Sequence, residues 1–221
     1  MSWRRIWMLC GLFIGATAWA QANFPNKPVN IIVPFPPGGA ADQPSRLFGQ
    51  AMNNVWKSGT VVVTRPGAGG AIGATAVANA APDGHTLLAT NPSLVILPEA
   101  DRLFGRNPAF ERSQFVPLGL LVADPLVLVV KADAPWKNYN EFVADARANP
   151  DKITYGSSGA YSASHLPIEM LAHAANMKLR HISYSGGGPA ILAVLGGHIG
   201  VTASSPSAVM AHIKSGALRP L

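Results

Sequence analysis

Residues 29–42 read VNIIVPFPPGGAAD, a run of apolar, β-branched residues that enters three prolines and then two glycines. Val29–Val33 is typical of a strand. The prolines stiffen the chain, and the glycines permit positive φ and the close approach of another molecule. A helix is expected to follow, with Asp42 as its N-cap and Pro44 tolerated in its first turn. This stretch predicts an α/β fold.

The same pattern repeats along the chain. Short apolar runs alternate with amphipathic stretches, which predicts parallel-rich sheets flanked by helices. We expect strands at Val29–Val33, Thr60–Thr64, Thr86–Thr90, Phe115–Val122, Leu126–Lys131, Thr154–Ser157, His181–Tyr184 and His198–Ala203. We expect helices at Gln43–Val55, Ala71–Ala80, Tyr139–Asn149, Ser162–Asn176, Pro189–Leu195 and Ser207–Ser215. The first helix carries an apolar face made of Leu47, Phe48, Ala51, Met52 and Val55.

The first 22 residues differ from the rest. Arg4 and Arg5 precede an apolar run that is too short to span a bilayer, and alanines in A-x-A spacing follow it. This pattern predicts a cleaved secretory signal peptide at residues 1–22; an uncleaved membrane anchor is the alternative. Behind it we expect two lobes with a cleft between them, lobe I at residues 23–121 and lobe II at residues 122–221.

Composition excludes several classes of protein. With 48% hydrophobic and 13% charged residues, the chain is expected to be globular and not disordered. The only cysteine, Cys10, lies in the predicted signal peptide, so the mature chain has no thiol chemistry. Loss of Arg4 and Arg5 lowers the formal net charge from +6 to +4, and the remaining basic residues are scattered. We therefore expect no nucleic-acid partner, whereas a small anion would be attracted.

Three glycine-rich joints share one design, at residues 34–42, 155–162 and 184–190. Each joins the end of a predicted strand to the start of a helix, which is the edge where parallel sheets bind ligands. Helix N-termini donate hydrogen bonds and carry about half a positive charge, so the joints favour an anion. The alternative for any single joint is that such turns simply favour Gly and Pro.

Five motifs occur in a fixed order over nearly all of residues 24–221. They are FPNKP at 24–28 with the first joint behind it, RPGAGGAIG at 65–73, APDGHTLL at 81–88, YGSSG at 155–159 and YSGGGPA at 184–190. Together they resemble the Bug-type (TctC-like) receptors of tripartite tricarboxylate transporters. The resemblance implies a periplasmic, two-lobed binding protein of the type II, Venus-flytrap kind. Such a receptor closes on a small organic carboxylate and passes it to membrane permease subunits.

The resemblance also assigns ligand contacts, because the family holds one carboxylate at the first joint through backbone amides and ordered water. In lobe I they fall on Phe35, Pro37, Gly38, Gly39 and Asp42, with Asn91 and Ser93 lining the cleft. In lobe II they fall on Ser157, Ser158, Tyr161, Tyr184, Gly186, Gly187, Gly188, Pro189 and Ala190. We expect a monomer without catalytic residues, cofactor or metal. The family chain continues beyond residue 221 to complete lobe I, so we expect a C-terminally truncated chain with exposed apolar surface.

Two enzyme-like readings compete with the receptor. Ser157 and Ser158 with His165 suggest a serine hydrolase, but G-x-S-x-G fails at Ala160. The glycines at 67–73 suggest a nucleotide site, but their spacing is not G-x-G-x-x-G, so we expect them to let a helix pack on the sheet.

Two further readings concern metals and signalling. His165, Glu169 and His173 lie at i, i+4 and i+8 of one predicted helix, which favours a solvated polar face over a metal site. A periplasmic sensor that signals to a membrane partner would use the same pocket and stays an open alternative.

Overall fold

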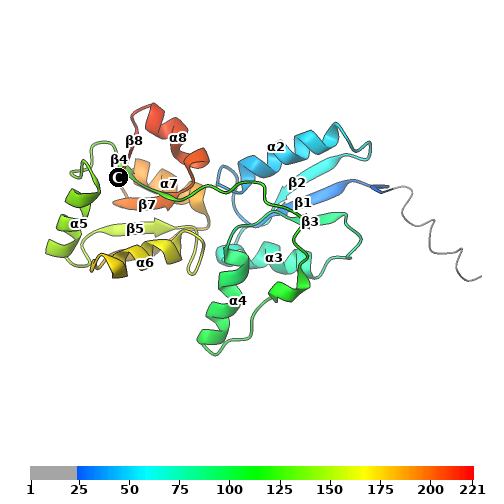
Figure 1. Cartoon of the computed structure of the whole chain (residues 1–221), viewed down its shortest axis with the longest axis horizontal. Coiled ribbons are helices and arrows are strands. Elements are labelled where there is room, and N and C mark those ends of the chain that lie inside the picture. The colour runs from blue at the N-terminus through cyan, green and yellow to red at the C-terminus, as the bar shows by residue number, and fades with distance from the viewer. Residues whose placement is uncertain (1–23) are drawn as a thin grey trace, which may run out of the picture.

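The computed structural model describes residues 24–221, so the predicted signal peptide lies outside the described residues. Two α/β bodies stand side by side, and an extended segment at residues 115–126 runs from one to the other (Figure 1). Lobe I contains a three-stranded sheet in the order β2-β1-β3, and lobe II a five-stranded sheet in the order β6-β5-β7-β4-β8. The two-lobed α/β fold is confirmed, whereas the exact boundary at residue 121 stays a prediction.

Lobe I is organised around β1 (Val29–Val33), which pairs in parallel with β2 (Thr60–Thr64) and β3 (Thr86–Leu88). The apolar side chains of β1 are buried on both faces of the sheet. The helices of this lobe are α2 (Asp42–Asn53), α3 (Ala71–Ala78) and α4 (Ser93–Leu103), with 3-10 turns η2 (Ala68–Gly70) and η3 (Arg112–Gln114). In Figure 1, α2 covers one side of the sheet, and α3 and α4 lie on the other.

Helix α3 packs against the end of β1 at Gly73. A Cβ atom at this position would lie 2.6 Å from Cβ of Pro34 and 2.9 Å from the carbonyl oxygen of Arg65. No larger residue fits without moving the backbone, so this glycine serves the packing of helix on sheet, as the sequence suggested.

Lobe II has a mixed sheet. β5 (Thr154–Ser157) is parallel to β6 (Arg180–Ser183) and β7 (Val201–Ser204), whereas β4 (Val127–Lys131) is antiparallel to β7 and β8 (Leu218–Pro220). The helices are α5 (Tyr139–Ala148), α6 (His165–Ala174), α7 (Gly187–Leu195) and α8 (Pro206–Lys214). Val129 and Val130 of β4 point into two different cores, one with Ile191 and Val209 and the other with Phe142 and Ile168. This alternation is the period of two that a strand imposes.

One predicted strand is wrong, and two elements of the structure were not predicted. The strand expected at Phe115–Val122 is wrong, because this segment is extended but pairs with no strand, and Leu118 and Leu120 expose 77% and 80% of their surface. Helix α4 and strand β8 were not predicted. Pro98 inside α4 hides the helical pattern, and β8 is only three residues long.

The packing face of α2 is also different from the prediction. Its buried residues are Asp42, Ser45 and Gly49, whereas Leu47 and Val55 of the apolar face are exposed. A Cβ atom on Gly49 would lie 3.1 Å from Cγ2 of Val62, so the small residues bring the helix onto β2. Among the described residues, no helix combines the length and apolar character that crossing a membrane requires.

Candidate ligand-binding site

The first and third joints face each other across the two lobes. A Cβ atom on Gly186 would lie 2.3 Å from Cδ of Pro36, and one on Gly188 would lie 3.2 Å from the carbonyl oxygen of Pro37. The joints follow the carboxyl ends of β1 and β6, where ligands bind in open α/β sheets. Residues 34–42 and 184–190 therefore meet at one place.

The second joint reaches lobe I at another point. A Cβ atom on Gly159 would lie 2.8 Å from Cα of Gly69, at the η2 turn. The backbone N–H of Ala163 donates a hydrogen bond to Oγ of Ser93, at the start of α4, over 3.1 Å. All three glycine-rich joints thus lie where the lobes touch.

The first joint presents backbone donors at the start of α2. Gly38 has φ +82°, a conformation that favours glycine, and its N–H is engaged by Oδ2 of Asp42 at 3.0 Å. Among the described residues, no hydrogen bond uses the N–H of Gly39, Ala40 or Ala41. The N–H of Gly38 is therefore satisfied within the joint and is not available to a ligand.

Asp42 orders this joint. It is buried and forms the first residue of α2, with Ala41 as N-cap, so the prediction of Asp42 as the cap is wrong. Its Oδ2 also accepts from Nε of Arg46 at 3.0 Å. Its Oδ1 is buried without a hydrogen bond of good geometry, although Nη2 of Arg46 lies 2.9 Å away. The hydrogen bond and charge of Asp42 raise the pKa of Arg46, and Arg46 in turn offsets the negative charge that would repel an anion.

The third joint contributes the start of α7. Gly186 is its N-cap, and the N–H groups of a first helical turn have no partner within the helix. A Cβ atom on Gly39 would lie 3.9 Å from the backbone nitrogen of Gly188. The amide-rich starts of α2 and α7 therefore face each other across the lobes. Pro189 has no N–H to donate, and Ala190 is buried in lobe II, so these two shape the turn.

The serines of the second joint are buried and bonded to one another. The N–H and Oγ of Ser158 each lie 2.9 Å from Oγ of Ser164. Oγ of Ser157 donates to the carbonyl oxygen of Gly159 at 2.9 Å and lies 2.6 Å from Nε2 of His181. Their hydroxyls hold the joint together.

Three other predicted ligand contacts, Phe35, Asn91 and Tyr184, make contacts within their own lobes. Phe35 is buried, and its ring packs beside Gly70 of lobe I, where a Cβ atom would lie 3.1 Å from Cζ. Oδ1 of Asn91 accepts from the N–H of Ser93 at 3.0 Å. The ring of Tyr184 covers Gly156, whose Cβ would lie 3.1 Å from Cε2. The side chains of Phe35 and Tyr184 thus pack within their own lobes.

A stack of rings lies beneath the second joint. His165 and His181 stack with ring centroids 4.1 Å apart, and Tyr155 stacks on His181 at 4.9 Å. Burial lowers the pKa of both histidines, and the charge of His165 lowers that of His181 further. Burial also raises the pKa of Tyr155, whose hydroxyl donates to Glu169. No sequence pattern pointed to His181, because it lies on β6, whereas Tyr155 lies on β5 and His165 on α6.

This stack corrects one prediction and bears on the hydrolase alternative. His165 is mostly buried, so a fully solvated face with Glu169 and His173 is wrong, although those two are exposed. The hydrolase reading paired a serine with His165, whereas His181 lies beside Ser157, whose hydroxyl is fully buried. Between Phe24 and Leu221, no group of three His, Cys, Asp or Glu residues is placed to hold a metal ion.

Two surface hollows lie elsewhere on lobe II. One is lined by Asp151, Glu169, His173 and Lys178, and the other by Tyr139, Arg147 and Leu171 among others. No predicted ligand contact lines either hollow. The candidate site therefore rests on the convergence of the joints.

A family model and individual relatives place this chain's sequence among the same group of proteins. Residues 46–221 match the model of the tripartite tricarboxylate transporter family receptor. A protein from the tcbD-tcbE intergenic region of a Pseudomonas species is 36% identical over 90% of this chain and 58% of its own length. BugT of Bordetella pertussis is 32% identical over 100% of this chain and 69% of its own.

Two solved structures of binding proteins resemble this chain in fold and in sequence. The periplasmic binding protein BugD has a TM-score of 0.82 and 32% identity, over 89% of this chain and 65% of its own. MatC of Rhodopseudomonas palustris, solved with bound malate, has a TM-score of 0.79 and 26% identity, over 89% of this chain and 66% of its own.

These relatives are longer than this chain, which spans 58% and 61% of the first two curated relatives. A solved periplasmic transporter with a TM-score of 0.82 is likewise covered over only 66% of its own chain. The resemblance carried by the five motifs is confirmed over most of the sequence. The chain belongs to the receptor family of the tripartite tricarboxylate transporters, a family of solute-binding proteins and not of enzymes.

Proposed function

We propose that this chain is a periplasmic receptor that captures a small organic carboxylate and delivers it to the permease subunits of a tripartite tricarboxylate-type transporter. The observation that carries the proposal is the approach of Gly39 in lobe I to Gly188 in lobe II. Malate in the related MatC structure supports a carboxylate as the ligand class. We further propose export through a cleaved signal peptide and a monomeric receptor.

The chemistry of the two helix starts suits a carboxylate. Each start carries about half a positive charge and several N–H donors, and one such interaction contributes about 0.3–2 kcal/mol. Micromolar binding needs about 8 kcal/mol, so donors from both lobes must act together in a site that excludes water. The ion pair of Asp42 and Arg46 leaves the first joint without net charge.

The proposed contacts differ in what they offer. Gly39, Gly187 and Gly188 would donate backbone N–H groups, and Pro37 and Gly38 would shape the first joint. Asp42 and the buried serines would orient the joints, and Tyr161 and Tyr184 would limit the space. The remaining proposed contacts are Phe35, Asn91, Ser93, Gly186, Pro189 and Ala190.

A thermal-shift and calorimetry screen of the purified full-length chain tests this function. Malate, adipate, citrate and benzoate are compared with glucose and arginine. A carboxylate at 100 times its Kd should raise the free energy of unfolding by about 2.7 kcal/mol, and the other two compounds should leave it unchanged. The absence of a shift with every carboxylate would contradict the proposal.

Gly39→Val tests the place of binding. The branched side chain would fill the space between the two helix starts, where a Cβ atom already lies 3.9 Å from the nitrogen of Gly188. Carboxylate binding should be lost, while the unfolding midpoint without ligand stays close to that of the wild type. Ala51→Val, at an exposed position of α2, is the control and should bind normally. Unchanged affinity in Gly39→Val would remove the first joint from the site.

A further inference from the structure

Tyr161 forms a corner in the second joint with an uncommon backbone conformation. Its φ is +59°, in the left-handed region that non-glycine residues seldom occupy. Its N–H donates a hydrogen bond to Nδ1 of His165 at 2.9 Å, and its ring packs edge-on against the ring of His165 at 5.6 Å. These contacts offset the cost of the left-handed conformation.

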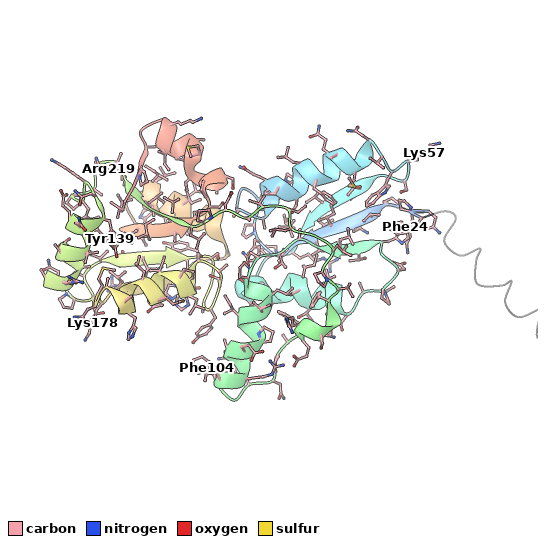
Figure 2. The ribbon with its side chains drawn as sticks, in the orientation of Figure 1. Phe24, Lys57, Phe104, Tyr139, Lys178 and Arg219 are labelled. Carbon is pink, nitrogen blue, oxygen red and sulfur yellow. The ribbon has the colours of Figure 1, made fainter. Side chains whose placement is uncertain are left out.

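The same corner touches lobe I. The ring of Tyr161 lies 5.4 Å from the ring of Phe104. Phe104 follows the last residue of α4 (Figure 2). Two residues further along, the N–H of Ala163 donates to Ser93 of lobe I. The backbone of residues 161–163 therefore links the His165 ring to the contact between the lobes.

The hydrogen bond from Tyr161 fixes the protonation state of His165. Nδ1 can accept only when it carries no proton, so the imidazole is neutral with its proton on Nε2. A proton on Nδ1 would point two N–H groups at each other. It would also place a positive charge 4.1 Å from the stacked ring of His181.

The surroundings of His165 have opposite effects on its pKa: burial lowers it and the Glu169 carboxylate raises it. On α6, the Glu169 carboxylate lies 3.8 Å from Nε2 and favours the protonated ring. On β5, Tyr155 stacks at 6.1 Å and its hydroxyl donates to Glu169. On β6, His181 stacks on His165 at 4.1 Å and lies 2.6 Å from Oγ of Ser157. Burial outweighs the carboxylate, so the pKa of His165 lies below its usual 6.5 and the ring is neutral at pH 7.

We propose that His165 is a positioning residue whose neutral ring holds the Tyr161 corner in the shape that lets lobe II close on lobe I, so that ligand affinity falls when His165 takes up a proton. The ligand part of this inference rests on the proposed function. The part that concerns the Tyr161 corner does not need a ligand.

The first test follows the Tyr161 backbone amide by NMR in the ligand-free, full-length chain. As pH falls from about 7.5 to about 5, its ¹H and ¹⁵N shifts should move together with the titration of the His165 ring. In His165→Asn, Oδ1 replaces Nδ1 as the acceptor and does not titrate in this range, so the amide shifts should stay constant. A Tyr161 amide that does not follow His165 in the wild type would overturn the inference.

The second test measures malate binding by calorimetry over the same pH range. The wild-type Kd should rise about tenfold on acidification, because the partly buried N–H of Tyr161 loses its acceptor. His165→Asn should change less than about threefold under the same conditions, since the acceptor is retained. His165→Gln, whose oxygen occupies the place of Nε2, should bind weakly at both ends of the range.

Controls separate this inference from the proposed function. His173→Asn removes an exposed histidine of the same helix and should follow the wild type. If His165→Asn shows the full wild-type loss of affinity, protonation of other groups or of malate is the cause, and the inference fails. If malate binds to no variant, the ligand assignment is at fault, and the Tyr161 amide still decides whether His165 positions the corner.

Discussion

Gly186 of lobe II lies so close to Pro36 of lobe I that a Cβ atom at position 186 would stand 2.3 Å from Cδ of the proline ring. The ring is covalently tied to the backbone and cannot rotate away. At Gly187, the next residue, a Cβ atom would meet nothing within 4 Å. The closed arrangement of the joints therefore needs glycine at position 186 and tolerates a methyl group at position 187.

Gly186→Ala should weaken ligand binding without unfolding either lobe. The clash would hold the joints apart, and overpacking of this kind costs about 1–3 kcal/mol, or about 5- to 150-fold in Kd. Calorimetry with malate measures the loss, and small-angle X-ray scattering with ligand shows whether the lobes stay apart. Gly119→Ala is the control, because a Cβ atom there would also meet nothing within 4 Å and no ligand contact is proposed at this residue; it should bind within about twofold of the wild type. Equal affinities of the two variants would show that this contact is not needed for binding.

Asp42→Ala should loosen the first joint. The substitution leaves the Gly38 N–H without its acceptor and Arg46 without its partner, and loss of such a side-chain-to-backbone bond costs about 0.5–2 kcal/mol. Urea unfolding measures this cost, and malate affinity should fall with it. Asp42→Asn keeps an acceptor for Gly38 and should restore most of the stability. If Asp42→Asn were as unstable as Asp42→Ala, the ion pair with Arg46, and not the bond to Gly38, would order the joint.

Local pattern predicted the order of most strands and helices. VNIIV forms β1 because a strand covered on both faces is mostly apolar; its one polar residue, Asn30, is only partly buried. The strand expected at Phe115–Val122 is wrong, because the segment has no partner strand. Its composition suits a strand, but β structure needs a partner for its backbone groups, and composition does not reveal a partner.

The site was predicted in outline and not in its details. The glycine-rich joints mark the carboxyl ends of strands, and they meet because these ends of the two sheets face each other across the lobes. The bond between Ser93 and Ala163 depends on how the lobes dock, which no local pattern contains. The stack of His165 on His181 depends on the pairing of β5 with β6, so the sequence interpretation treated His165 as solvated.

The segment between the lobes carries exposed apolar side chains at Leu118 and Leu120. Exposed apolar patches bind other apolar surfaces and promote association. Leu118→Ser with Leu120→Ser should therefore reduce binding of the dye ANS and self-association in sedimentation, while the free energy of unfolding changes by less than about 0.5 kcal/mol. Leu128→Ser, at a position packed against the lobe II core, should instead destabilise by about 2 kcal/mol or more. A comparable destabilisation by the double substitution would show that the segment is packed in solution.

The stacked histidines should also make the stability of lobe II depend on pH. Burial lowers the pKa of both His165 and His181 below the usual value of 6.5, so the unfolded chain takes up protons at a higher pH than the folded chain. The free energy of unfolding should fall as pH decreases below about 6.5 and level off below the folded-state pKa values. His165→Asn with His181→Phe should flatten this part of the curve, whereas His173→Asn, exposed on the same helix, should preserve it. Urea unfolding at stepped pH measures the slopes. A double variant that kept the full wild-type slope would assign the pH dependence to other groups, because no titrating ring would remain in the stack.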